Sequence, residues 1–216
     1  MSREATLKRI LDGGIVAVVR ADSGESLVQV VRALAEGGVT AAEITFTVPN
    51  ALEVIRQVRN AIGDQVVLGA GTVLDPETAR AALLAGAEYI VAPSLNLDVI
   101  RLCRRYDKVV MPGAFTPTEI VAAWEAGADV VKVFPADVAG PPYLKAIHGP
   151  LPQIRLMPTG GVDLNTAEAF LKAGACCLGV GSSLVSAKTV AEGDFAKIKD
   201  LAGQYAALVR RFRGTA

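Results

Sequence analysis

Asp129-Val130-Val131-Lys132-Val133-Phe134-Pro135 is the stretch that decides how the rest of this 216-residue chain is interpreted. Its β-branched apolar residues are typical of a strand that is buried on both faces, as in a parallel sheet. Burying an ammonium ion is costly, and the cost favours the neutral amine, which is also the nucleophilic form of lysine. Lys132 is therefore a candidate Schiff-base lysine. From this segment alone, an edge strand with Lys132 in water, or a structural ion pair, remains equally open.

The composition favours one α/β domain over residues 1–216. Hydrophobic residues make up 51% of the chain and aromatic residues 5%, which suits helices packed closely on a parallel sheet around one core. Basic and acidic residues number 22 each and form no long block of one sign, so neither nucleic acid nor an anionic membrane is expected as a partner. No secretory signal and no membrane-spanning apolar run is recognisable.

The cysteines and the one histidine indicate a cytoplasmic protein without a metal site. Cys103, Cys176 and Cys177 are expected to be reduced, because their number is odd and their spacing is not that of metal ligands. His148 is placed in a loop flanked by glycine and proline and has no assigned role. Trp124 is expected to pack within a helix. No metal or other cofactor is expected.

Strand and helix patterns alternate along the chain after a short first helix over about residues 3–12. The expected strands begin near Ile15, Ala42, Val66, Tyr89, Val109, Asp129, Arg155 and Cys176. Helix start signals lie between them, at Ser23, Asn50, Asp75 and the capping box from Thr116 to Glu119. Eight strand–helix pairs favour a (β/α)₈ TIM barrel. A doubly wound sheet is the alternative, but no G-x-G-x-x-G follows the first strand.

Polar residues and glycines follow the expected strands at their C-terminal ends, where barrel enzymes carry their active sites. Glu43 alternates with Ile44, so it shares a strand face with Thr45. We interpret Glu43 as a general base whose pKa is raised by burial, and a structural salt bridge, with Lys132 for instance, is the alternative. Arg20 ends the first strand and lies either on the surface or at the mouth, where its guanidinium would bind a carboxylate.

Two glycine-containing loops predict a phosphate site. They follow the seventh and eighth expected strands and contain Gly160, Gly161, Gly181, Ser182 and Ser183. Glycine lets backbone N–H groups approach phosphate oxygens, and these are the two loops that commonly hold phosphate in barrels. Ordinary turn chemistry is the alternative for either loop alone.

Four segments resemble the class I 2-keto-3-deoxy-6-phosphogluconate (KDPG) aldolases of the KDPG/KHG (4-hydroxy-2-oxoglutarate) aldolase family. The segments are Gly69-Ala70-Gly71-Thr72-Val73, Val131-Lys132-Val133-Phe134-Pro135-Ala136, Pro158-Thr159-Gly160-Gly161-Val162 and Gly179-Val180-Gly181-Ser182-Ser183-Leu184-Val185. The resemblance runs from about Ile15 to Val185. It implies a (β/α)₈ barrel, a homotrimer and a cytoplasmic lyase of the Entner-Doudoroff type that acts on a phosphorylated keto sugar acid and releases pyruvate.

The resemblance also implies a role for each matching residue. Lys132 matches the Schiff-base lysine and Glu43 the carboxylate that transfers protons. Thr72 and Phe134 match residues of the pyruvate pocket, and Thr159 matches the threonine linked to stereochemical preference. The remaining matches, in the phosphate region, are Gly160, Gly161, Gly181, Ser182 and Ser183.

One departure from the family pattern affects the substrate assignment. Many members carry an arginine shortly after the glutamate to bind the pyruvate carboxylate, whereas this chain has Thr45-Phe46-Thr47-Val48-Pro49 there. Arg20 is expected to supply that charge, as in the related 2-keto-3-deoxy-6-phosphogalactonate aldolases. Those aldolases tend to lack a hydroxyl at the position of Thr159, which favours the gluconate substrate. The alternatives left open are the galactonate substrate, 4-hydroxy-2-oxoglutarate, a phosphate-binding isomerase or synthase without an imine, and a barrel without catalytic activity.

Overall fold

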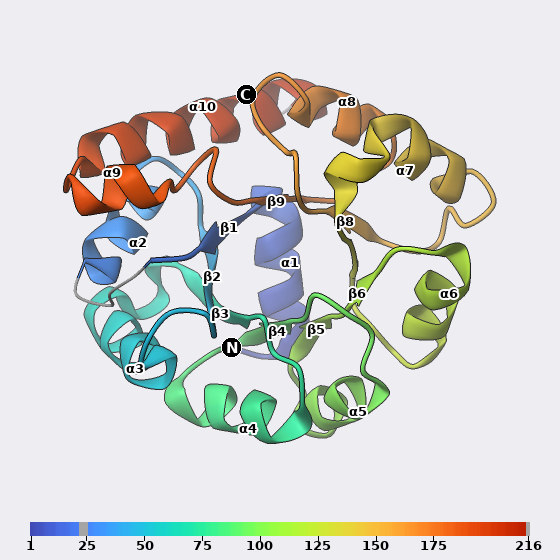
Figure 1. Ribbon diagram of the computed structural model, residues 1–216, viewed down its shortest axis with the longest axis horizontal. Coiled ribbons are helices and arrows are strands. Elements are labelled where there is room, and N and C mark those ends of the chain that lie inside the picture. Colours follow the sequence, from blue (N-terminus) through green and yellow to red (C-terminus); the bar gives the residue numbers. More distant parts are fainter. Residues whose placement is uncertain (22–25, 215–216) are drawn as a thin grey trace.

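The computed structural model describes residues 1–21 and 26–214 as an α/β fold, in which parallel strands form a curled sheet with helices around it (Figure 1). The strands are β1 (Ile15–Val19), β2 (Ala41–Thr45), β3 (Val67–Gly71), β4 (Tyr89–Val91), β5 (Val109–Met111), β6 (Gly113–Ala114), β7 (Val131–Val133), β8 (Leu156–Pro158) and β9 (Leu178–Val180). The α-helices are α1 (Arg3–Gly13), α2 (Leu27–Glu36), α3 (Ala51–Ile62), α4 (Pro76–Ala85), α5 (Leu97–Arg105), α6 (Pro117–Glu125), α7 (Gly140–His148), α8 (Ala167–Lys172), α9 (Ala187–Ala191) and α10 (Phe195–Arg213). Two 3₁₀ helices, η1 (Gly63–Gln65) and η2 (Ala136–Val138), complete the described elements.

The strands follow one another in chain order. Six strands pair in the order β5-β4-β3-β2-β1-β9, and three pair in the order β6-β7-β8. Isolated parallel bridges, Leu156 with Ala175 and Thr159 with Gly179, connect the β8 region to the β9 region. The first strand thus pairs with the last, which the doubly wound alternative does not allow.

The expected fifth strand is divided into β5 and β6, which corrects the prediction of one continuous strand. Pro112 lies between them and has no N–H to donate to a ladder. The other expected strands begin within about two residues of their predicted positions. The capping box of Thr116 and Glu119 is present, and Asp75 accepts a hydrogen bond from the Thr78 N–H. The predicted cap Ser23 lies outside the described residues.

Two predictions about loops and caps were wrong in detail. Asn50 occupies the N-cap position of α3, but its backbone is left-handed (φ 55°) and its side chain makes no capping hydrogen bond. His148 is the last residue of α7 rather than part of a loop, and its ring lies against Gly174, where a β-carbon would be 2.6 Å from it. The neighbouring proline and glycine had suggested a turn here. Ala146 and Ile147 are helical instead, and alanine in particular favours a helix.

Side chains of alternate strand residues enter two separate apolar clusters. The outer cluster packs the strands against the surrounding helices and includes Ala17, Ile44, Val131 and Leu178. The inner cluster lies on the opposite strand face and consists of Ile10, Val16, Ala41, Val67, Tyr89, Val91, Val109, Met111, Val130, Met157 and Cys177. Because both faces of the strands are buried, successive strand residues are apolar rather than alternately apolar and polar.

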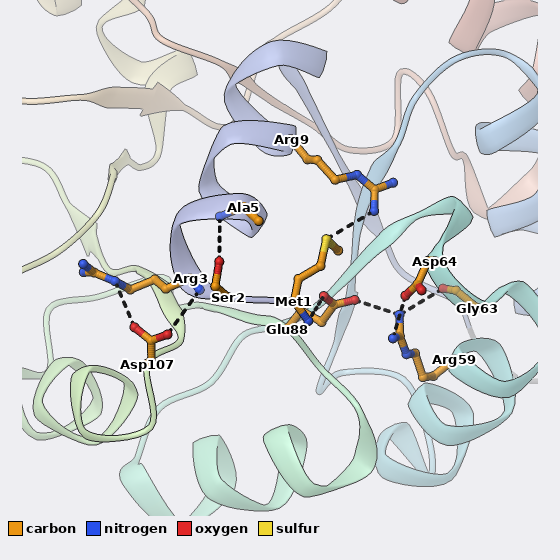
Figure 2. A network of polar contacts seen from close by, with 10 residues as sticks. All are labelled: Met1, Ser2, Arg3, Ala5, Arg9, Arg59, Gly63, Asp64, Glu88 and Asp107. Carbon is orange, nitrogen blue, oxygen red and sulfur yellow. Dashed lines mark hydrogen bonds and ion pairs between the residues drawn. The ribbon is translucent and has the colours of Figure 1, made fainter.

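Helix α1 covers the inner cluster at the N-terminal end of the strands. Figure 1 shows it crossing the centre of the curled sheet, and Ile10 is fully buried there. Figure 2 shows how its start is held: the Met1 amine lies 3.7 Å from Glu88, which also pairs with Arg59 at 2.8 Å, and Arg3 lies 3.5 Å from Asp107. Because α1 covers the N-terminal ends of the strands, the cavity that Arg20 and Thr159 line lies at their C-terminal ends. No helix in the described ranges has the length and apolarity that crossing a membrane requires.

Candidate active site

The candidate site residues continue the inner face of the strands toward their C-terminal ends. Lys132 lies two residues after Val130, Glu43 two after Ala41, and Thr159 two after Met157, and all three partners belong to the inner cluster. Because strand side chains alternate with a period of two, Lys132, Glu43 and Thr159 point to the same interior. Each is buried, which is unusual for lysine and glutamate.

Lys132 is only 3% exposed, so the alternative of an edge lysine in water is wrong. Burial lowers the pKa of its ammonium group, the carboxylate of Glu43 opposes this, and the positive charge of Arg20 lowers the pKa further. Its Nζ lies 5.1 Å from the centre of the Phe134 ring. The described residues include no ion pair to Lys132, so the amine is buried without a salt bridge.

Glu43 is 1% exposed, and neither carboxylate oxygen has a hydrogen-bond partner among the described residues. Burial raises the pKa of its carboxyl group, while the charges of Lys132 and Arg20 lower it by smaller amounts. The two pKa shifts have opposite signs: the acid holds its proton more tightly and the amine less tightly than in water. This is the electrostatic setting of a nucleophilic amine beside a general acid–base.

A cavity of about 220 Å³ opens beside this pair. Its lining includes most of the predicted substrate-binding residues: Arg20, Phe134, Thr159, Gly160, Gly161, Gly181, Ser182 and Ser183, together with Val18, Val162 and Asp163. Lys132, Glu43 and Thr72 are not in the lining. Phe134 connects the two regions, because it lines the cavity and faces the Lys132 amine.

Thr159 contributes a buried hydroxyl without a partner in the described part of the chain. It packs against Gly179, where a β-carbon would overlap Oγ1. Thr72 directly follows β3 and has φ 58°, a left-handed conformation that is strained for a β-branched residue. The structure thus brings Thr159 to the cavity but places Thr72 outside its lining.

The two predicted phosphate loops are linked by a chain of hydrogen bonds. The Ser183 hydroxyl donates to the Val162 carbonyl at 2.7 Å, and the Tyr205 hydroxyl donates to Ser183 at 3.1 Å. Tyr205 lies on α10 and is fully buried. Ser183 is therefore engaged in holding the loops together, whereas backbone groups at Gly160 and Gly161, both with positive φ, remain at the cavity.

Sequence reasoning missed three polar residues around this site. Asp163 lines the cavity, and hydrogen bonds from the Thr166 and Asn165 N–H groups lower its pKa. Its position directly after Gly160-Gly161-Val162 was the only signal. Tyr205 and Tyr89 had none, because both occur in apolar patterns that predict simple packing. In the ranges the structure describes, no group of three or more His, Cys, Asp or Glu side chains is arranged to hold a metal ion.

Comparison with known proteins gives a consistent set of similarities. The family described as KDPG and KHG aldolase matches residues 7–201. The chain is 37% identical to 2-dehydro-3-deoxy-phosphogluconate aldolase of Treponema pallidum, over 88% of this chain and 90% of the other. It is 34% identical to 2-dehydro-3-deoxy-6-phosphogalactonate aldolase of Escherichia coli, over 92% and 94%. The structure of KDPG aldolase from Legionella pneumophila, with pyruvate captured as a covalent carbinolamine, matches with a TM-score of 0.84 at 27% identity, over 91% and 96%.

Proposed function

Because the chain belongs to the KDPG and KHG aldolase family, we propose that it is a class I aldolase that cleaves 2-dehydro-3-deoxy-6-phosphogluconate to pyruvate and glyceraldehyde 3-phosphate. The observation that carries the proposal is the buried Lys132 amine, which has no ion pair among the described residues and lies within electrostatic range of a buried carboxylate, Glu43. The covalent pyruvate carbinolamine in the Legionella relative supports the same chemistry.

In the proposed reaction, Nζ of Lys132 attacks the C2 carbonyl of the keto acid, and loss of water leaves an iminium ion. Glu43 takes the proton of the C4 hydroxyl as the C3–C4 bond breaks. The electron pair of that bond moves toward the iminium and forms an enamine. Glyceraldehyde 3-phosphate leaves. Glu43 then returns the proton to C3, and hydrolysis of the iminium releases pyruvate and restores the amine.

The two ends of the substrate are assigned to different residues in and beside the cavity. Arg20, with Thr72 in support, binds the keto-acid carboxylate, and Phe134 packs beside the pyruvate carbons. The loops carrying Gly160, Gly161, Gly181, Ser182 and Ser183 bind the phosphate. We assign Thr159 to the hydroxyl-bearing carbons of the sugar acid, because its buried hydroxyl has no hydrogen-bond partner among the described residues. Holding both ends aligns the scissile bond with the iminium π system.

Borohydride trapping tests the Schiff base. Pyruvate plus borohydride is expected to add one reduced adduct, which peptide mass spectrometry locates at Lys132. Lys132→Ala should abolish the adduct, whereas Lys145→Ala, at an exposed position on α7, should not. A normal adduct in Lys132→Ala would end the assignment, and no adduct in the unaltered protein would favour an isomerase or synthase without an imine.

Substrate preference is tested by coupled pyruvate release. The gluconate-derived substrate is expected to be cleaved faster than its galactonate epimer, 4-hydroxy-2-oxoglutarate and the non-phosphorylated acids. Thr159 is the residue on which this preference rests. A galactonate preference would agree instead with the 34% identical E. coli relative, and no cleavage of any of them would leave a barrel without catalytic activity.

The proposal includes an architecture and an assembly. The bridges between the β8 and β9 regions, and the short gap at Pro112 between β5 and β6, support closure of the strands into one (β/α)₈ barrel domain over the whole chain. The resemblance to the family supports a homotrimer that acts in the cytoplasm in an Entner-Doudoroff type of pathway. Three cysteines without disulfide partners are compatible with that location.

A further inference from the structure

Tyr89 lies in the inner cluster, where burial of its polar hydroxyl group is unfavourable. Its side chain is fully buried, and the hydroxyl has no hydrogen-bond partner within the described residues. Phenylalanine would fill the same space without burying a polar atom, whereas a buried hydroxyl without a hydrogen-bond partner is destabilising. Packing therefore accounts for the ring of Tyr89 but not for its hydroxyl.

Strand register directs the Tyr89 ring toward Glu43. Glu43 on β2 is paired with Gly69 on β3, and Gly69 is paired with Tyr89 on β4. The three residues thus form one row across adjacent strands. Gly69 has no side chain to separate its two neighbours, and a β-carbon there would overlap Cζ of Tyr89, the ring carbon that carries the hydroxyl.

The Glu43 carboxylate leans over the same strand from the other side. A β-carbon on Gly71, two residues beyond Gly69 and on the same face, would be 2.6 Å from Oε1 of Glu43. Two glycines of β3 thus leave room for an unpartnered hydroxyl and an unpartnered carboxylate above one strand. A hydroxyl donor and a carboxylate acceptor satisfy each other, either directly or through one water molecule.

We propose that the Tyr89 hydroxyl is the hydrogen-bond donor that orients the Glu43 carboxylate and stabilises its ionised form during proton transfer. Tyr89 is a positioning residue, since it acts on substrate only through Glu43. The role deepens the proposed aldolase function and rests on it. It also distinguishes Tyr89 from the two charged groups near the base: Lys132 and Arg20 act on Glu43 through their charge, whereas the neutral Tyr89 hydroxyl would supply a directional hydrogen bond.

The groups that face this pair come from several elements. Glu43 is influenced by Lys132 of β7 and by Arg20 after β1. Burial raises the pKa of Tyr89 well above its ordinary value, and the charges of Glu43, of Cys177 before β9 and of Glu88 before β4 raise it further, so its hydroxyl stays protonated and able to donate. No other titratable group is needed to explain a change in the ionisation of Glu43.

The test compares Tyr89→Phe with the unaltered protein by ¹³C NMR of glutamate carboxyl groups, with the Glu43 signal assigned from its loss in Glu43→Gln. Removing the donor is expected to raise the pH at which Glu43 titrates by about one unit, because the ionised form loses its hydrogen bond. Tyr106→Phe is the matched control: the same atom is removed from an exposed tyrosine that stacks on Arg80. An unchanged Glu43 titration in Tyr89→Phe overturns the proposal.

A second measurement separates this role from simple packing. Exchange of the pyruvate methyl protons with deuterated water reports proton transfer at C3, and it is expected to slow about tenfold in Tyr89→Phe, with the borohydride adduct retained. In a Glu43→Gln background the same change should have no further effect. Equal slowing in both backgrounds, or loss of the adduct, would show that Tyr89 does not act through Glu43. The NMR titration needs no substrate, so it still decides the Tyr89 contact if the aldolase assignment itself fails.

Discussion

The carboxylate of Glu43 lies so close to the α-carbon of Gly71 that a methyl group there would be 2.6 Å from Oε1. Gly71→Ala must therefore displace the carboxylate or the strand. We expect kcat for aldol cleavage to fall about 100-fold, the scale of a misplacement of roughly 1 Å, while pyruvate still forms its borohydride adduct. Gly203→Ala on α10 is the control, since a β-carbon there would be 3.9 Å from the Gly37 carbonyl oxygen, an ordinary contact distance. A normal kcat in Gly71→Ala would mean that the position of Glu43 is not critical.

Adduct formation should depend on pH in the way that the Lys132 environment dictates. Burial lowers the pKa of the amine, so the neutral nucleophile is present at a lower pH than for a lysine in water. Glu43→Gln removes the charge that opposes this shift and should move the profile to still lower pH. Arg20→Ala should move it to higher pH. Rates of trapping by cyanoborohydride between about pH 5 and 10, a range below the ordinary pKa of lysine, measure all three profiles. Shifts of the reverse sign would contradict the assigned electrostatics.

Arg20 is exposed but lines the cavity, so its loss should affect binding rather than folding. Arg20→Ala is expected to raise KM for the keto acid at least about tenfold, because a charge-assisted hydrogen bond to the carboxylate is lost. Steady-state kinetics and thermal unfolding provide the two measurements. Arg32→Ala, at an exposed site on α2, is the control. Unchanged kinetics would return Arg20 to the role of a surface residue.

Tyr205 should influence phosphate binding from outside the cavity. Tyr205→Phe removes the donor to Ser183, which in turn holds the Val162 carbonyl of the neighbouring loop. We expect KM for the phosphorylated substrate to rise about fivefold, the value of one ordinary hydrogen bond. KM for 4-hydroxy-2-oxoglutarate, which has no phosphate, should stay the same. An equal rise for both substrates would indicate a general loss of structure.

Asp129 stabilises the start of the strand that carries Lys132. Its buried carboxylate pairs with Arg3 at 3.1 Å and accepts a hydrogen bond from the Val110 N–H at 3.0 Å. Asp129→Ala leaves that N–H without a partner and is expected to lower the free energy of unfolding by about 2 kcal/mol. Urea denaturation measures this change. Asp98→Ala, which breaks an exposed pair with Arg101, should cost less than about 1 kcal/mol. Equal losses would show that Asp129 has no special role.

The sequence by itself determined the order of strands and helices, the place of Lys132 on a strand, and the end of the strands at which the polar residues gather. These features are local: periodicity two places Glu43 and Lys132 on defined strand faces, and Thr116 or Asp75 caps a helix through its own neighbours. The family resemblance then followed from short segments in a fixed order. The match of the family to residues 7–201 confirms that the chain is a member.

Only the tertiary structure decided which of these groups meet. Tyr89, Gly69 and Glu43 are far apart in the chain, and their row exists because parallel register aligns three strands. The link from Tyr205 to Ser183 likewise depends on how α10 packs against the β9 loop. No local pattern specifies such contacts, since register and helix packing are set by the whole core at once. The sequence alone therefore predicts only that the Tyr89 ring packs in the core. The role proposed for its hydroxyl depends on Glu43, which the strand register places in the same row.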